Sequence, residues 1–250
     1  MKKIITILMV IVIPITIFFV FLKGNKSEND IINNEKSFNI SKISIYSGAS
    51  GENVSENYQN PEWNLNIYQY SDIVIYLSRI SDFNDTNNIK RLYIDNINLG
   101  STNLGVPVLY YLNPYDYGTD KINGNNEITD SLEFNVLNSE NIDNDISYSI
   151  PILFQDLSNP ITLKYVNKEI VKSYKFSNEE KMIFNGTLLK TVRVNPKDIE
   201  NKISFCINIK TGDNRLLKQK IEISIPLKDN NNLSLYDGNI EYEEMLDISF

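Results

Sequence analysis

Residues 63–77 read WNLNIYQYSDIVIYL, and their pattern predicts the class of the fold. Apolar or aromatic side chains alternate with polar ones from Trp63 to Ile67, and residues 73–77 are rich in β-branched and aromatic side chains. A β-strand points successive side chains to opposite faces, so alternation with a period of two is typical of a strand. β-Branched and aromatic residues also favour strands. We therefore predict that this stretch forms strand rather than helix.

The same pattern recurs on both sides of this stretch, in short runs rich in Ile, Val, Tyr and Phe. Asn, Asp, Gly and Pro separate the runs, as they do at turns between strands. The further runs are residues 40–45, 92–97, 106–112, 132–136, 149–154, 161–166, 188–194, 203–209 and 220–225. About eleven strands at this spacing predict an all-β fold, namely a β-sandwich, with the immunoglobulin-like form as one version of it.

An uncharged apolar segment at residues 4–22 follows Lys2 and Lys3. A helix of this length crosses a hydrocarbon core of about 30 Å. The segment is longer than the apolar region of a signal peptide, and no small-residue cleavage motif follows it. We therefore predict an uncleaved transmembrane anchor at residues 1–23, with a cleaved signal peptide as the alternative. Lysines flank both ends, and the positive-inside bias slightly favours a cytoplasmic N-terminus in the cell membrane, with the remaining chain outside.

Behind the anchor, the chain divides by composition into three parts. Residues 24–37 are polar and predict a tether, residues 38–228 hold the strand-like runs of the β-sandwich domain, and residues 229–250 form an acidic C-terminal tail. This last segment is either a recognition tail for a basic partner or a final element docked on the domain. The net charge of −8 argues against nucleic acid as a partner.

The chain contains no histidine and a single cysteine, Cys206. Without imidazole, Ser-His-Asp and Cys-His catalysis and most zinc enzymes are excluded. No phosphate-binding, dinucleotide-binding or nucleophile-elbow motif occurs either, so we expect no cofactor and no enzymatic activity. Cys206 lies in an alternating run and is predicted to be a buried thiol. Glycoside hydrolysis needs only two carboxylates, so a histidine-free glycosidase stays open as an alternative.

Residues 110–118 read YYLNPYDYG and hold the candidate binding residues Tyr111, Tyr115 and Tyr117. Exposed tyrosines on a loop stack on sugar rings or anchor protein partners. The alternative is that this segment ends a strand and packs a corner over the core. The overlapping stretch 116–127 resembles a calcium loop in its oxygen-bearing side chains, but Gly118 and Lys121 stand where a ligand and the turn glycine are required. We expect a polar turn without a metal there.

Several stretches of the chain resemble one group of bacterial proteins. They are residues 63–67 with 70–73, 92–97, 110–114 with 117–118, 159–163 with 165–168, and 236–238. Over most of residues 38–238 they are similar to a group of uncharacterised, N-terminally membrane-anchored β-sandwich proteins of Firmicutes-type bacteria. The resemblance implies the architecture and the location of the chain. It implies no activity, and no site residue follows from it.

These observations favour a membrane-anchored, extracytoplasmic β-sandwich that acts by binding, alone or as a subunit of an envelope assembly. Its expected partners are the membrane, through residues 4–22, and an envelope protein. A carbohydrate- or Ca²⁺-binding surface module is the first alternative, and the histidine-free glycosidase is the second. In the favoured interpretation, the anchor sets the position of the domain and the sandwich presents a loop or an edge to its partner.

Overall fold

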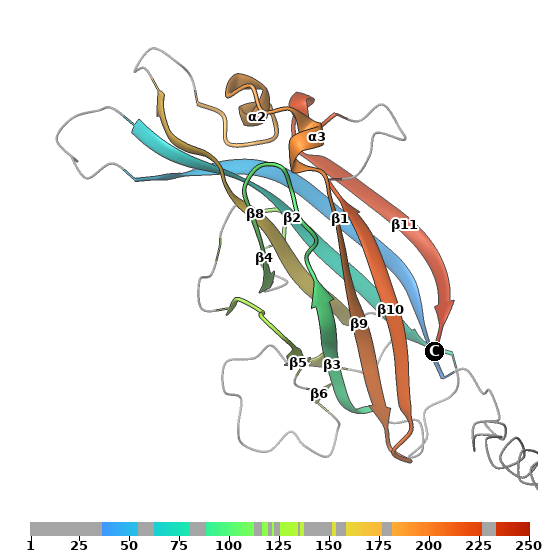
Figure 1. Cartoon of the computed structure of the whole chain (residues 1–250). Helices are drawn as coiled ribbons and strands as arrows, with labels where there is room; N and C mark the ends of the chain where they lie inside the picture. The colour runs from blue at the N-terminus through green and yellow to red at the C-terminus, as the bar shows by residue number, and fades with distance from the viewer. Residues whose placement is uncertain are drawn as a thin grey trace, which may run out of the picture. The chain divides into compact units, whose positions relative to one another are not determined.

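The computed structural model describes residues 37–54, 63–80, 89–112, 117–119, 122, 126–134, 136–137, 152–153, 159–176, 182–226 and 234–250. Most of these residues lie in strands, and the strands form two large antiparallel sheets (Figure 1). The all-β class predicted from the alternation is therefore confirmed. The predicted anchor at residues 4–22 lies outside the described residues. Within them, no helix is both long enough and apolar enough to cross a membrane.

The first sheet, called sheet A, has the order β11-β1-β2-β8-β4 among the described strands. Its strands are β1 (Phe38–Asn53), β2 (Trp63–Arg79), β4 (Val106–Tyr111), β8 (Asn159–Phe176) and β11 (Ile240–Ser249). All neighbours in it run antiparallel, and Ile43 of β1 lies opposite Ile75 of β2, which in turn lies opposite Ile161 of β8. Because side chains alternate along a strand, this register gathers the apolar residues on one face of the sheet.

The second sheet, called sheet B, has the order β10-β9-β3-β5 within the described part of the chain. Its strands are β3 (Ile89–Asn98), β5 (Leu132–Phe134), β9 (Asn201–Thr211) and β10 (Leu216–Ile225), all antiparallel to their neighbours. A separate short parallel pair consists of β6 (Val136–Leu137) and β7 (Ile152–Leu153).

One hydrophobic cluster joins the two sheets. Ile73 and Ile75 of β2 and Phe205 and Ile207 of β9 belong to it, and each is at most 1% exposed. Burial of such side chains is the main favourable contribution to folding, at about 25 cal/mol for each Å² of apolar surface removed from water. Cys206 is also buried, as predicted. Two antiparallel sheets with a shared apolar core fit a β-sandwich.

Short helical elements cover a second hydrophobic cluster beside the long strands of sheet A (Figure 1). In the described residues they are α2 (Thr187–Thr191), α3 (Pro196–Ile199) and the 3₁₀ turn η3 (Leu235–Asp237). The strand predicted for residues 188–194 is therefore wrong. A short apolar run fits a strand or a helical turn equally well, and the helix buries the adjacent Leu188 and Leu189 together.

The acidic C-terminal segment includes an edge strand of sheet A. β11 pairs along β1, with Tyr242 opposite Ile45 and Glu244 opposite Ile43. The sequence left open whether this ending is a recognition tail or a final element docked on the domain. Residues 240–249 form the docked element. Charged residues suit this position, because they discourage an exposed sheet edge from pairing with another chain at random.

Candidate functional site

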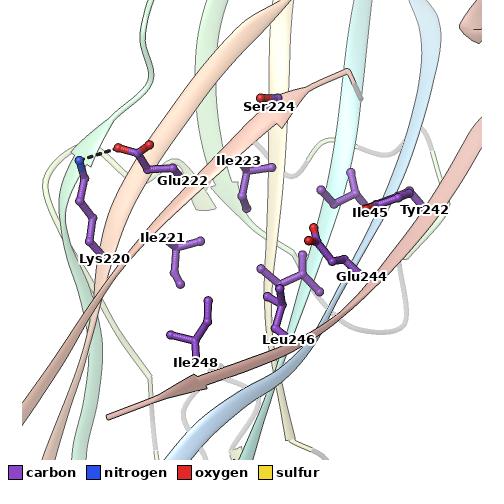
Figure 2. Close-up of a pocket in the computed structure, with 11 residues that line it drawn as sticks. Ile45, Lys220, Ile221, Glu222, Ile223, Ser224, Tyr242, Glu244, Leu246 and Ile248 are labelled. Carbon is purple, nitrogen blue, oxygen red and sulfur yellow. Dashed lines mark hydrogen bonds and ion pairs between the residues drawn. The ribbon is translucent and has the colours of Figure 1, made fainter. Parts of the chain in front are cut away.

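A groove opens along one edge of the domain, between β10 of sheet B and β11 of sheet A (Figure 2). Its volume is about 510 Å³, within the range of about 300–1,000 Å³ that is usual for ligand sites. Three strands contribute the lining, which consists of Ile43, Ile45, Lys220, Ile221, Glu222, Ile223, Ser224, Tyr242, Glu244, Leu246 and Ile248.

The two walls of the groove differ in what they present. From β11 every second residue lines the groove, from Tyr242 to Ile248, so one face of that strand covers it. From β10 the five consecutive residues 220–224 line it. Consecutive residues point to opposite faces of a sheet. The groove therefore runs along the edge of β10, where the backbone of the strand is accessible from the groove. β10 is the last strand of sheet B on this side among the described residues.

The floor of the groove is aliphatic. Ile43 and Ile45 of β1 and Ile221 and Ile223 of β10 are buried members of the main hydrophobic cluster. Leu246 and Ile248 of β11 are partly buried and pack against the same cluster. Figure 2 shows the isoleucines of β10 and the side chains of β11 on the two sides of the gap. An apolar floor of this kind offers burial to an apolar ligand group, but it supplies no reactive group.

The polar groups of the groove lie at its rim. Hydrogen bonds from Lys202 and Lys220 lower the pKa of Glu222 to about 2. Both lysines form ion pairs with this carboxylate, at 2.5 Å and 2.7 Å. Across the groove, burial raises the pKa of Tyr242, and the negative charge of Glu244 adds to the rise. No ion pair to Glu244 occurs within the part of the chain that the structure describes.

The rim therefore holds two carboxylates, Glu222 and Glu244, on opposite walls. A glycosidase of the two-carboxylate type needs one of them as a general acid, with a pKa raised towards neutrality. Glu222 has a lowered pKa and is held by two lysines. Glu244 belongs to the exposed residues of β11. The arrangement suits recognition of a ligand better than bond cleavage.

The tyrosines predicted from sequence lie elsewhere. Tyr111, at the end of β4, packs edge-on against Phe134 with ring centroids 6.0 Å apart, and burial raises its pKa. Tyr117 packs against Tyr46 of β1 at 5.9 Å, and burial raises its pKa as well. Tyr115 lies outside the described residues. Tyr111 packs against the hydrophobic cluster between the sheets, whereas Tyr46, the ring partner of Tyr117, packs against a different cluster. Binding by these residues stays a prediction.

Beside Tyr117 lies a buried ion pair on the face of sheet A that points away from sheet B. Lys164 of β8 and Asp72 of β2 are direct partners across the two strands, with Nζ and Oδ1 2.5 Å apart and side-chain exposures of 2% and 0%. The backbone N–H of Gly118 donates to Asp72 Oδ2 at 2.7 Å, and Lys164 donates to the carbonyl of Thr119 at 2.7 Å. The pair thus attaches the segment 117–119 to the sheet.

Neither the groove nor the ion pair was predicted from the sequence. A charged residue inside an apolar run was the available signal for Asp72 in YSDIVIY and for Lys164 in ITLKYV. The groove had no local signal, because its lining combines side chains of β1 with those of β10 and β11, which lie far from β1 in the sequence. Half of the calcium-loop candidate, residues 116–127, lies outside the described residues. Among the residues that the structure describes, no group of three or more acidic, His or Cys side chains could hold a metal ion.

Comparison with known proteins adds no relative to these observations. No protein-family model matches the chain, and no curated protein or solved structure matches it either.

Proposed function

We propose that this chain is a non-catalytic binding module that is anchored in the cell membrane and contacts an envelope protein through the groove between β10 and β11. The groove carries this proposal: an aliphatic floor of buried isoleucines opens to solvent between two charged rims. Interfaces of this composition bury an apolar centre and use a polar rim for specificity.

The immunoglobulin-like form of the β-sandwich is part of the proposal, and the strand order supports it. The strands β1, β2, β8 and β4 are adjacent in sheet A, and β10, β9 and β3 are adjacent in sheet B. Numbered A to G along the chain, these strands follow the ABED and CFG orders of a constant-type immunoglobulin domain. β11 and β5 are then additions at sheet edges. Such a fold hosts many functions, so it supports the architecture alone.

The location rests on the sequence. The apolar segment at residues 4–22 has the length of a membrane span, and Lys2 and Lys3 precede it. We place the N-terminus in the cytoplasm and the folded domain outside. The test is protease treatment of intact cells that produce the full-length chain. Digestion of the domain, with residues 1–23 protected and resistant to carbonate extraction, is expected; a domain that is digested only after lysis would contradict this orientation.

The binding role is tested by site-specific photo-cross-linking of the full-length chain in the envelope. A benzophenone amino acid replaces Tyr242, which lines the groove, or Asp247, which points away from it on the same strand. A discrete adduct with one envelope protein is expected at position 242 and not at position 247. Adducts of equal strength at both positions, or at neither, would contradict binding in the groove.

A further inference from the structure

The two sheets differ in width at the groove. In the described residues, sheet A has five strands and sheet B has four. β10 packs against β1, because Ile221 and Ile223 lie in the same cavity as Ile43 and Ile45. β11 is the next strand beyond β1, so it extends past the edge of sheet B. The inward-facing side chains of β11 therefore cover a space in which the described part of sheet B has no strand.

The edge of β10 faces this space with its backbone. Residues 220–224 line the groove without a gap in the sequence, whereas β11 contributes only alternate residues. A strand at the end of a ladder carries N–H and C=O groups that point away from the sheet, and these groups template the addition of another strand. The groove thus combines a hydrogen-bonding edge on β10 with an apolar cover from β11.

We propose that the groove binds an extended peptide segment of a partner protein, which adds to β10 as a further strand of sheet B. This inference rests on the proposed function and specifies its partner. Main-chain hydrogen bonds to β10 would supply part of the affinity, and alternate side chains of the peptide would supply the specificity. The peptide's inward residues are apolar, since they meet Leu246, Ile248 and the isoleucines of β1.

Charge selects the kind of peptide. Lys220 and Lys202 are already paired with Glu222. Glu244 points from β11 into the groove (Figure 2), and β11 carries three more acidic residues and no basic one. The bound segment therefore carries a Lys or Arg opposite Glu244, because a charge pair across the rim steers association and fixes the register. A second copy of this chain would instead bring the same acidic strand to the groove.

The test uses the full-length protein in detergent micelles and a phage-displayed library of random peptides of about twelve residues, close to a long strand. Selected peptides are expected to alternate apolar and polar residues and to contain a basic residue. Glu244→Lys should weaken their binding by about tenfold. Asp247→Lys is the matched control: it makes the same charge change on the outward face of the same strand and should leave binding unchanged.

Hydrogen exchange then separates strand addition from other binding in the groove. The selected peptide should slow exchange at alternate backbone amides of residues 220–224. Binding that is sensitive to Glu244→Lys but leaves these amides unprotected would overturn strand addition and leave the binding function intact. Failure to select any alternating, basic peptide would overturn the inference, and so would self-association through the groove, detected as a dimer by light scattering. Neither result bears on the cross-linking test with envelope proteins.

Discussion

Replacing Lys164 with methionine tests whether the buried ion pair with Asp72 holds the outer face of sheet A together. The two side chains are 2% and 0% exposed, and their charged atoms are 2.5 Å apart. Lys164 also lies over the ring of Tyr70, with Nζ 4.5 Å from its centroid. Methionine keeps most of the length and of the apolar part of the lysine side chain but removes the charge. The carboxylate of Asp72 then loses this counter-ion while it stays buried.

The expected cost follows from the desolvation of that carboxylate. Removing one partner of a buried pair costs about 3–5 kcal/mol, because the remaining charge is left in a medium of low polarity. The N–H of Gly118 still donates to Asp72 and offsets a part of this cost. We therefore expect Lys164→Met to lower the free energy of unfolding by roughly 3 kcal/mol. This is a large share of the roughly 5–15 kcal/mol that is typical of a domain.

The assay is urea unfolding of the wild type and of matched variants, followed by tyrosine and tryptophan fluorescence. Lys42→Met is the control, since it breaks the ion pair with Glu243 at the surface. The side chain of Lys42 is 25% exposed and that of Glu243 is 54% exposed. Such pairs contribute about 0–1 kcal/mol. The double variant Asp72→Leu with Lys164→Met removes both buried charges and should recover most of the loss, because apolar replacements of a buried pair are often neutral.

Two results would refute the reasoning. In the first, Lys164→Met and Lys42→Met lower the free energy of unfolding by amounts that agree within about 1 kcal/mol. In the second, the double variant is less stable than Lys164→Met alone. The first result would mean that the site admits water, and the second that the pair adds net stability beyond its desolvation cost. Proteolysis at residues 117–119 gives a local readout, since both members of the pair hold this segment.

Further predictions concern backbone strain and two ionisable groups. Gly105→Ala should destabilise the protein far more than Gly118→Ala in thermal unfolding. Both glycines have positive φ, but a Cβ on Gly105 would clash with Asn167 Oδ1 and lie 2.7 Å from the backbone oxygen of Lys168, whereas the nearest atom to a Cβ on Gly118 is 3.8 Å away. Burial raises the pKa of Tyr165 to about 12. The stability that depends on its neutral hydroxyl is therefore present below pH 10 and is lost as the pH rises through 12. Tyr165→Phe has no hydroxyl to ionise, so roughly 3 kcal/mol of this alkaline loss in the free energy of unfolding should be absent from the variant. An NMR titration should place the pKa of Glu222 at about 2, because two lysines donate to it, and high salt should raise this pKa.

Each of these has a clear contrary outcome. Equal losses for Gly105→Ala and Gly118→Ala would mean that positive φ alone sets the cost. An unchanged alkaline unfolding curve for Tyr165→Phe would show that its hydroxyl, which accepts a hydrogen bond from Asn201, ionises without loss of structure. A pKa of Glu222 that does not rise in the double variant Lys202→Met with Lys220→Met would exclude the lysines as the cause.

Local pattern was sufficient for the strands. Alternation over residues 63–77 predicted what became most of β2, and a comparable run at 203–209 lies within β9. The reason is stereochemical: the period of two belongs to the strand itself and can be read without knowledge of its neighbours. The strand prediction for residues 188–194 failed because a short apolar run cannot be assigned to a strand or a helix by its period alone. The second hydrophobic cluster shows that the adjacent Leu188 and Leu189 are both buried.

The sequence alone therefore established the all-β class, the buried thiol of Cys206 and the exclusion of histidine chemistry. It predicted the anchor from the length of one apolar run. The tertiary structure alone decided that Asp72 meets Lys164, that the acidic ending pairs with β1, and that β11 extends past β10 to form the groove. Lys42 of β1 and Glu243 of β11, which form an ion pair, are 201 positions apart. Contacts at such separations depend on how the sheets are assembled, and no local period of side chains encodes them.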